Sequence, residues 1–222
     1  SWWPCAMTLL EMISRCRSRA FDTAKPYFWS DEQWTDALNE AEEEACIRAR
    51  LLEDDSIRTV AVEQYAYVKI PPEAFLVRRV LVGGNPIDLS YQDDMASALH
   101  RGWESDVGTP LRCYRTGDRL RLHPIPIEAA DVILSAFCTP TTQMLLSKAD
   151  DDTPKIAGRL HVKLIDWALA RFYGVEDADH ANANLAGVHE ARFVETFGRR
   201  PEETEMRRTA LRARRSSSGH FF

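Results

Sequence analysis

The side chains that could perform chemistry are scattered along the chain and form no recognised catalytic motif. The sequence contains no phosphate-binding glycine loop, no HExxH and no GxSxG. Its six histidines have no metal-ligand spacing, and His161 and Asp166 share a predicted helix without facing each other. We therefore expect no catalytic residues, no metal ion and no cofactor, and predict that the chain is not an enzyme. An enzyme whose site is assembled from distant residues remains a hypothesis.

Three features suggest a ligand, but their surroundings favour a structural role. The run Asp150–Asp152 offers carboxylates, yet Ca²⁺ requires about six to eight oxygens from a defined loop, so we expect a solvated connector. Gly83-Gly84 precedes Asn85-Pro86 and is better explained as a turn between strands. His189 lies alone on an apolar helix face, which predicts a hydrogen-bonded core histidine.

Two charged segments are stronger candidates for function. Glu40, Glu43 and Glu44 lie opposite the apolar stripe of a predicted helix, and Ile47 lies off that stripe. This face is either solvated or contacts another subunit or lines a lumen. Residues 199–215 carry seven arginines against three glutamates, and two phenylalanines end the chain. The segment is either disordered or an arm that becomes ordered on a partner. Its residues proposed for contact are Arg207, Arg208, Arg212, Arg214, Arg215, Phe221 and Phe222.

Four amphipathic helices are predicted to position these segments. The first covers about residues 8–20, where Thr8 and Glu11 fit a capping box. The second follows a capping box at Ser30 and Gln33, and its apolar stripe continues to Leu52. The others cover about 156–173, apolar on most sides and therefore central, and 181–197.

The sequence between these pairs of helices has the period of β-strands. Six or seven short strands are expected, with one hairpin joining 57–62 to 65–70 and another joining 111–115 to 119–123. A short helix is expected from Ser90 to Leu99. We therefore predict an α+β fold, a helical bundle of about four helices with an inserted antiparallel β-rich domain. The predicted boundaries are 1–55 and 141–198 for the bundle, 56–140 for the insert and 199–222 for the arm.

The composition excludes several classes of protein. The chain has 222 residues, and its net charge of −6 is not typical of a non-specific nucleic-acid binder. The five cysteines form no CxxC pair, which predicts buried, reduced thiols in a cytosolic compartment. No stretch approaches the roughly 18 apolar residues of a membrane span, and the start lacks the features of a signal peptide. We expect no membrane partner.

Several segments resemble one known family. Trp29-Ser-Asp-Glu followed by Leu38-Asn-Glu-Ala-Glu-Glu-Glu-Ala45 resembles the second helix of tailed-bacteriophage head–tail connector proteins, also called tail adaptors. Asp166-Trp-Ala-Leu169 and Glu190-Ala-Arg-Phe193 resemble the later helices of that family, and Leu120-Arg-Leu-His-Pro124 fits its middle segment. The resemblance spans about residues 7–200.

This resemblance implies a structural virion protein at the head–tail interface, made in the host cytoplasm. It implies a ring, typically of twelve copies, that joins the portal protein to tail or nozzle proteins while genomic DNA passes through without specific binding. The arm would dock into the portal, and Glu40, Glu43, Glu44 and Ile47 would supply a subunit or lumen face. The alternative is a nucleic-acid-binding regulatory protein that uses the basic C-terminal tail.

Overall fold

The computed structural model describes residues 6–90, 92, 95–96, 99–176 and 179–202. Its elements fall into two compact units. The helical unit contains the residues up to Leu52 together with residues 139–200, and the sheet unit contains residues 53–138. Each unit has a hydrophobic core of its own.

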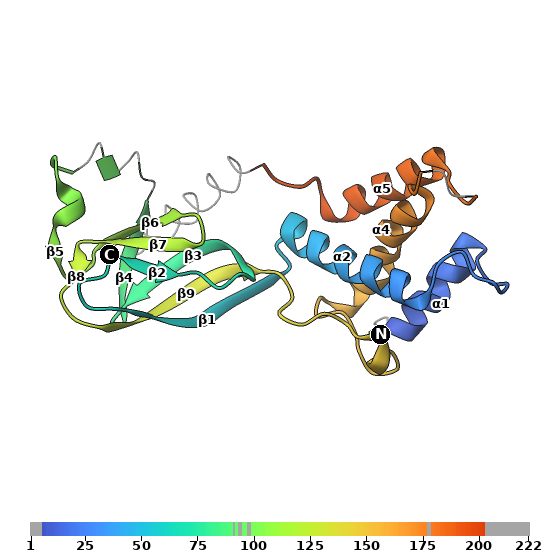
Figure 1. The fold of residues 1–222 in the computed structure, drawn as a ribbon, viewed down its shortest axis with the longest axis horizontal. Coiled ribbons are helices and arrows are strands. Elements are labelled where there is room, and N and C mark those ends of the chain that lie inside the picture. Colours follow the sequence, from blue (N-terminus) through green and yellow to red (C-terminus); the bar gives the residue numbers. More distant parts are fainter. Residues whose placement is uncertain (1–5, 91, 93–94, 97–98, 177–178, 203–222) are drawn as a thin grey trace, which may run out of the picture. The chain divides into compact units, whose positions relative to one another are not determined.

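Four α-helices build the helical unit among the described residues: α1 (Leu9–Ala20), α2 (Asp31–Ala49), α4 (His161–Tyr173) and α5 (Ala183–Phe197) (Figure 1). Both predicted capping boxes are confirmed, at Thr8 with Glu11 and at Ser30 with Gln33. Short 3₁₀ turns, η2 (Leu146–Lys148) and η3 (Gly158–Leu160), precede α4. The helix predicted from residue 156 thus begins at His161.

α4 is the central helix, as its sequence predicted, because it contacts α1, α2 and α5. Its side chains Leu164, Ile165, Ala168, Leu169 and Phe172 are fully buried. The predicted stripe of α2 is confirmed from Trp34 to Ala45. Beyond that point it is wrong, since Ala49 is exposed and Leu52 already begins strand β1.

Seven strands form the main sheet of the sheet unit, in the spatial order β1-β9-β3-β4-β6-β7-β2. Their bounds are β1 (Leu52–Ala61), β2 (Tyr67–Lys69), β3 (Ala74–Val82), β4 (Asn85–Ser90), β6 (Arg112–Thr116), β7 (Arg119–His123) and β9 (Ala130–Cys138). β5 (Val107–Gly108) and β8 (Ile125–Pro126) form a small second sheet, and a 3₁₀ turn, η1, covers Trp103–Ser105.

The predicted fold class, a helical bundle with an inserted antiparallel β-rich domain, is wrong. The fold is a mixed α+β structure with a large seven-stranded sheet and four described helices. The sheet is also not purely antiparallel, because β4 pairs with β6 in the parallel direction. A parallel pair needs a long crossover, here the segment between Ser90 and Arg112, and residue alternation does not reveal the direction of pairing.

One predicted hairpin is confirmed and the other is wrong. β6 and β7 pair antiparallel around Gly117, which has a positive φ of 59°. β1 and β2, in contrast, lie at opposite edges of the sheet, and β2 pairs with β7. In the segment between β1 and β2, the backbone N–H of Gln64 donates to the carbonyl of Pro126. The helix expected from Ser90 to Leu99 falls largely outside the described residues.

The four described cysteines are buried thiols, and none forms a disulfide. Burial raises the pKa of Cys16, Cys46 and Cys113 to about 12, which leaves these thiols unreactive at neutral pH. Within the ranges that the structure describes, no helix is both long and apolar enough to cross a membrane.

Candidate functional site

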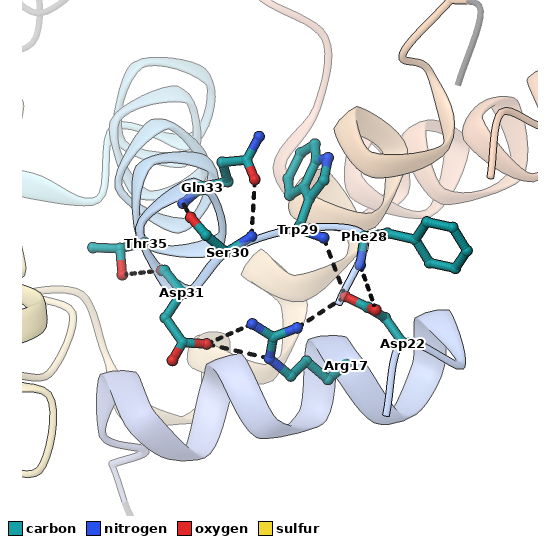
Figure 2. Close-up of polar contacts among 8 residues, drawn as sticks. All are labelled: Arg17, Asp22, Phe28, Trp29, Ser30, Asp31, Gln33 and Thr35. Carbon is teal, nitrogen blue, oxygen red and sulfur yellow. Dashed lines mark hydrogen bonds and ion pairs between the residues drawn. The ribbon is translucent and has the colours of Figure 1, made fainter. Parts of the chain in front are cut away.

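A buried ion pair fixes the turn that joins α1 to α2 (Figure 2). Arg17 Nη1 donates to Asp22 Oδ2 at 2.9 Å, and the two side chains are only 10% and 1% exposed. The other side of the guanidinium donates to Asp31 Oδ1, from Nη2 at 2.6 Å and from Nε at 3.2 Å. Asp22 also accepts the backbone N–H groups of Phe28 at 2.8 Å and Trp29 at 3.3 Å. One carboxylate therefore holds both ends of the turn.

This turn presents aromatic side chains to solvent. Phe21 is 87% exposed, and Phe28 is also exposed. In Figure 2 the Phe28 ring points away from the carboxylate of Asp22. Tyr27 lies against the guanidinium of Arg17, 3.8 Å from the ring centroid, so its ring is held in place. We call residues 21–28 the aromatic turn.

The acidic residues predicted as a contact face are for the most part paired. Glu40 accepts hydrogen bonds from Arg171 of α4, and Glu44 bonds to Arg48 at 3.0 Å and to Arg200 at 2.9 Å. Arg48 and Arg171 both lie over the ring of Trp167, at 4.9 and 4.7 Å from its centroid. These ion pairs thus join α2 to α4 and to Arg200, which lies three residues beyond the end of α5.

The remaining predicted site residues occupy different positions. Glu43 is exposed and forms no ion pair within the described part of the chain, whereas Ile47 is half-buried. The arm residues lie outside the described residues: Arg207, Arg208, Arg212, Arg214, Arg215, Phe221 and Phe222. Their role stays a prediction.

A pocket of about 460 Å³ lies between α2 and α4. Its walls include the apolar side chains of Trp29, Ala37 and Val175 and the charged side chains of Asp36, Glu40 and Arg171. Asp36 is exposed and has no ion-pair partner among the described residues. The pocket therefore combines an apolar wall with a charged rim, in which, within the described part of the chain, Glu40 and Arg171 pair and the carboxylate of Asp36 does not. We call it the α2–α4 pocket.

Histidines in the helical unit serve the fold. His189 Nδ1 bonds to Asp166 Oδ1 at 2.9 Å, and its ring stacks on Tyr173, which confirms a hydrogen-bonded histidine. His161 is buried with both ring nitrogens bonded: Nδ1 accepts from the backbone N–H of Met7 at 3.0 Å, and Nε2 donates to the carbonyl of Ile156 at 3.0 Å. The described residues contain no group of three or more histidine, cysteine or acidic side chains suited to a metal ion.

In the sheet unit, two arginines of β7 pair with Tyr67 of β2 and with Tyr65, which precedes that strand. Arg121 donates to the hydroxyl of Tyr67 at 3.1 Å and to the carbonyl of Glu104 at 2.7 Å. Arg119 donates to the hydroxyl of Tyr65 at 3.1 Å. These guanidinium groups are occupied by partners in their own unit, so their first role is to hold the sheet edge to the neighbouring loops.

Sequence reasoning missed the aromatic turn and the pocket. Phe21, Tyr27 and Phe28 lie near Pro26 in the segment between the first two predicted helices, for which no role was predicted. Large apolar residues in such a loop were the signal that could have identified it. The pocket had no signal, because α2 and α4 are separated by more than a hundred residues.

Among the described residues, two exposed features without a role in the single chain are the aromatic turn and the α2–α4 pocket, which are surfaces that a partner can contact. The comparison with known families agrees: the chain belongs to the SU10 adaptor protein family, a family of phage head–tail adaptors, with a match over residues 7–217. No curated protein matches the chain. Its family gives the chain a structural adaptor role in a bacteriophage, in contact with other head and tail components.

Proposed function

We propose that the chain is one subunit of a connector ring that joins the portal to the tail of the virion. The observation that carries the proposal is the family match, which covers nearly the whole chain and extends into the arginine-rich segment. In this proposal twelve copies form the ring, tail or nozzle proteins bind its other side, and genomic DNA passes through its lumen. No catalytic step is needed, because the task is to hold two assemblies together.

The arginine-rich arm is the proposed contact with the portal. The contact between Arg200 and Glu44 supports this proposal, because it anchors the first residues of the arm to α2. Arg48 adds a hydrogen bond to the carbonyl of Gly198 at 3.4 Å. With its base fixed in this way, an arm of high positive charge can reach an acidic surface on a partner without detaching from its own helical unit.

Removal of residues 203–222 tests the arm, since Arg200 and its ion pair are kept. The truncated chain should retain the thermal unfolding midpoint of the wild type but bind isolated portal rings at least tenfold more weakly in a sedimentation assay. A full-length chain with Arg207, Arg208 and Arg212 changed to Glu is the matched control for chain length and should show the same loss. Binding equal to the wild type in both variants would refute the docking arm.

Glu43 offers the cleanest test of a lumen face. Reversal of Glu40 or Glu44 would break ion pairs with Arg171, Arg48 or Arg200, whereas Glu43 has none in the described structure. In the proposed lumen, Glu43→Lys would attract DNA and slow its release from filled particles. Glu190→Lys, on the exposed side of α5, is the control. Release kinetics that are the same for both variants and the wild type would remove Glu43 from the lumen.

A further inference from the structure

We propose that the aromatic turn of one copy inserts Phe21 into the α2–α4 pocket of a second copy. This inference rests on the proposed ring and names the contact that builds it. Phe21, which we call the knob, and the α2–α4 pocket belong to the same helical unit, but Phe21 does not line the pocket. One chain therefore offers both halves of a head-to-tail contact.

Phe21 has an exposed ring that nothing within a single chain explains. It caps the C-terminus of α1 with φ 57° and ψ 24°, in the left-handed region, which costs a residue with a β-carbon about 1–2 kcal/mol. Glycine or asparagine is usual at such a position. This backbone conformation ends α1, because the N–H of Asp22 then donates to the carbonyl of Arg17 at 3.0 Å, but the ring of Phe21 stays in solvent and gains nothing from folding. Burial in a partner would supply the missing stabilisation.

The knob is held rigidly, as a binding element should be. Asp22, the next residue, is fixed by Arg17 and by two backbone N–H groups (Figure 2). The N–H of Phe21 itself donates to the carbonyl of Arg17. An anchor residue that is already ordered loses little conformational entropy when it binds. The backbone that carries the ring of Phe21 is therefore already ordered before the ring binds.

The α2–α4 pocket has the size and lining for such a ring. A cavity of about 150 Å³ is enough to hold benzene, and this pocket measures about 460 Å³. Trp29 and Val175 provide apolar contact surface on its wall, and Val175 is itself exposed in the single chain.

Charge complementarity selects a second copy as the occupant. Arg19 and Lys25 flank Phe21 in sequence, are exposed, and form no ion pair among the described residues. The rim of the pocket carries Asp36, which is likewise unpaired there, beside the paired Glu40. The cations beside Phe21 therefore have an opposite charge, the carboxylate of Asp36, on the rim of the pocket. Because the two halves differ, the contact repeats from copy to copy and closes into a ring if the rotation permits.

Disulfide trapping tests this geometry on the full-length chain. In a Cys5→Ser background, Thr23→Cys, an exposed position beside Phe21 that leaves the ring in place, combined with Val175→Cys should give a ladder of cross-linked dimers, trimers and larger species upon mild oxidation. A head-to-tail contact requires both cysteines, so Val175→Cys alone should give no ladder. Products that stop at the dimer, or no cross-link in the double variant, would overturn the inference.

Assembly on portal rings separates this inference from the proposed function. Phe21→Asn removes the ring but suits the left-handed backbone, so the chain should fold at least as well as the wild type. We expect half-saturation of portal rings to require at least about 30-fold more of this variant, the effect of a binding hot spot. Leu145→Asn, which changes another exposed apolar residue of the helical unit, is the control. If Phe21→Asn saturates portal rings at the same concentration as the wild type, the inference about Phe21 is overturned and the connector proposal stands. If the wild type does not bind portal rings, both proposals are overturned.

Discussion

Arg17 and Asp22 are joined by an ion pair in which neither side chain is more than a tenth exposed, and this pair determines the path of the chain between α1 and α2. The carboxylate satisfies two backbone N–H groups besides the guanidinium. Removal of one member of such a pair leaves the other charge buried without full compensation. The pair is therefore the structural basis of the aromatic turn.

Replacement of Asp22 should destabilise the helical unit. We expect Asp22→Asn to lower the free energy of unfolding by about 3 kcal/mol, because the buried Arg17 keeps only Asp31 as an ionised partner. Denaturant unfolding followed by the fluorescence of Trp29 and Trp34 measures the change. Asp150→Asn, at an exposed position of the same unit, should change stability by less than about 0.5 kcal/mol. Equal effects of the two substitutions would show that the pair does not hold the turn.

His161 should be equally sensitive. His161→Phe keeps the aromatic volume but leaves the N–H of Met7 and the carbonyl of Ile156 without their partner in a buried site. We expect a loss of about 2–3 kcal/mol in the same unfolding measurement. His100→Phe, at an exposed histidine, is the control. A stability of His161→Phe within 0.5 kcal/mol of the wild type, on the order of a surface substitution, would contradict the two bonds.

Glu42 should make stability depend on pH in the direction opposite to a salt-bridged acid. Burial raises the pKa of this carboxyl above its ordinary value of 4.5, although the backbone N–H groups of Lys155 and Ile156 act the other way. The folded state then holds the proton more tightly than the unfolded state. Its contribution is complete below pH 4.5 and is lost as the pH rises through the raised folded-state pKa.

Glu42→Gln tests this dependence, because the amide oxygen can still accept from Lys155 and cannot ionise. Its stability relative to the wild type should increase as the pH rises from 4.5 to neutrality. Glu43→Gln, on the exposed side of the same helix, is the matched control. A relative stability of Glu42→Gln that stays flat or falls over this range would contradict the raised pKa.

The buried thiols predict a simple labelling pattern. In a Cys5→Ser chain at pH 8, Cys16, Cys46 and Cys113 should react with a thiol reagent only after denaturation, since burial raises their pKa to about 12. Mass spectrometry after a short labelling pulse identifies each site. Rapid labelling of any of these three cysteines in the folded chain would disagree with their burial.

The features that could be predicted from the sequence are local ones. Thr8 with Glu11 and Ser30 with Gln33 were predicted as caps because the bonds that define a capping box join residues three apart. Gly117 was predicted in a turn because few other residues adopt its backbone conformation.

The features that could not be predicted depend on distant partners. The partner of Glu40 is Arg171, 131 residues away, and no pattern around Glu40 indicates that the charge is neutralised. The strand at Tyr67 alternates correctly, but its neighbour is Arg121 and not the preceding strand. The exposure of Phe21 could not be predicted either, because a large apolar residue such as phenylalanine is more often buried.

Native mass spectrometry of the chain mixed with portal rings tests the central claim most directly. The account predicts a single complex that contains the portal and a complete ring of twelve adaptor subunits. A chain that stays monomeric and unbound in the presence of saturating portal would contradict it.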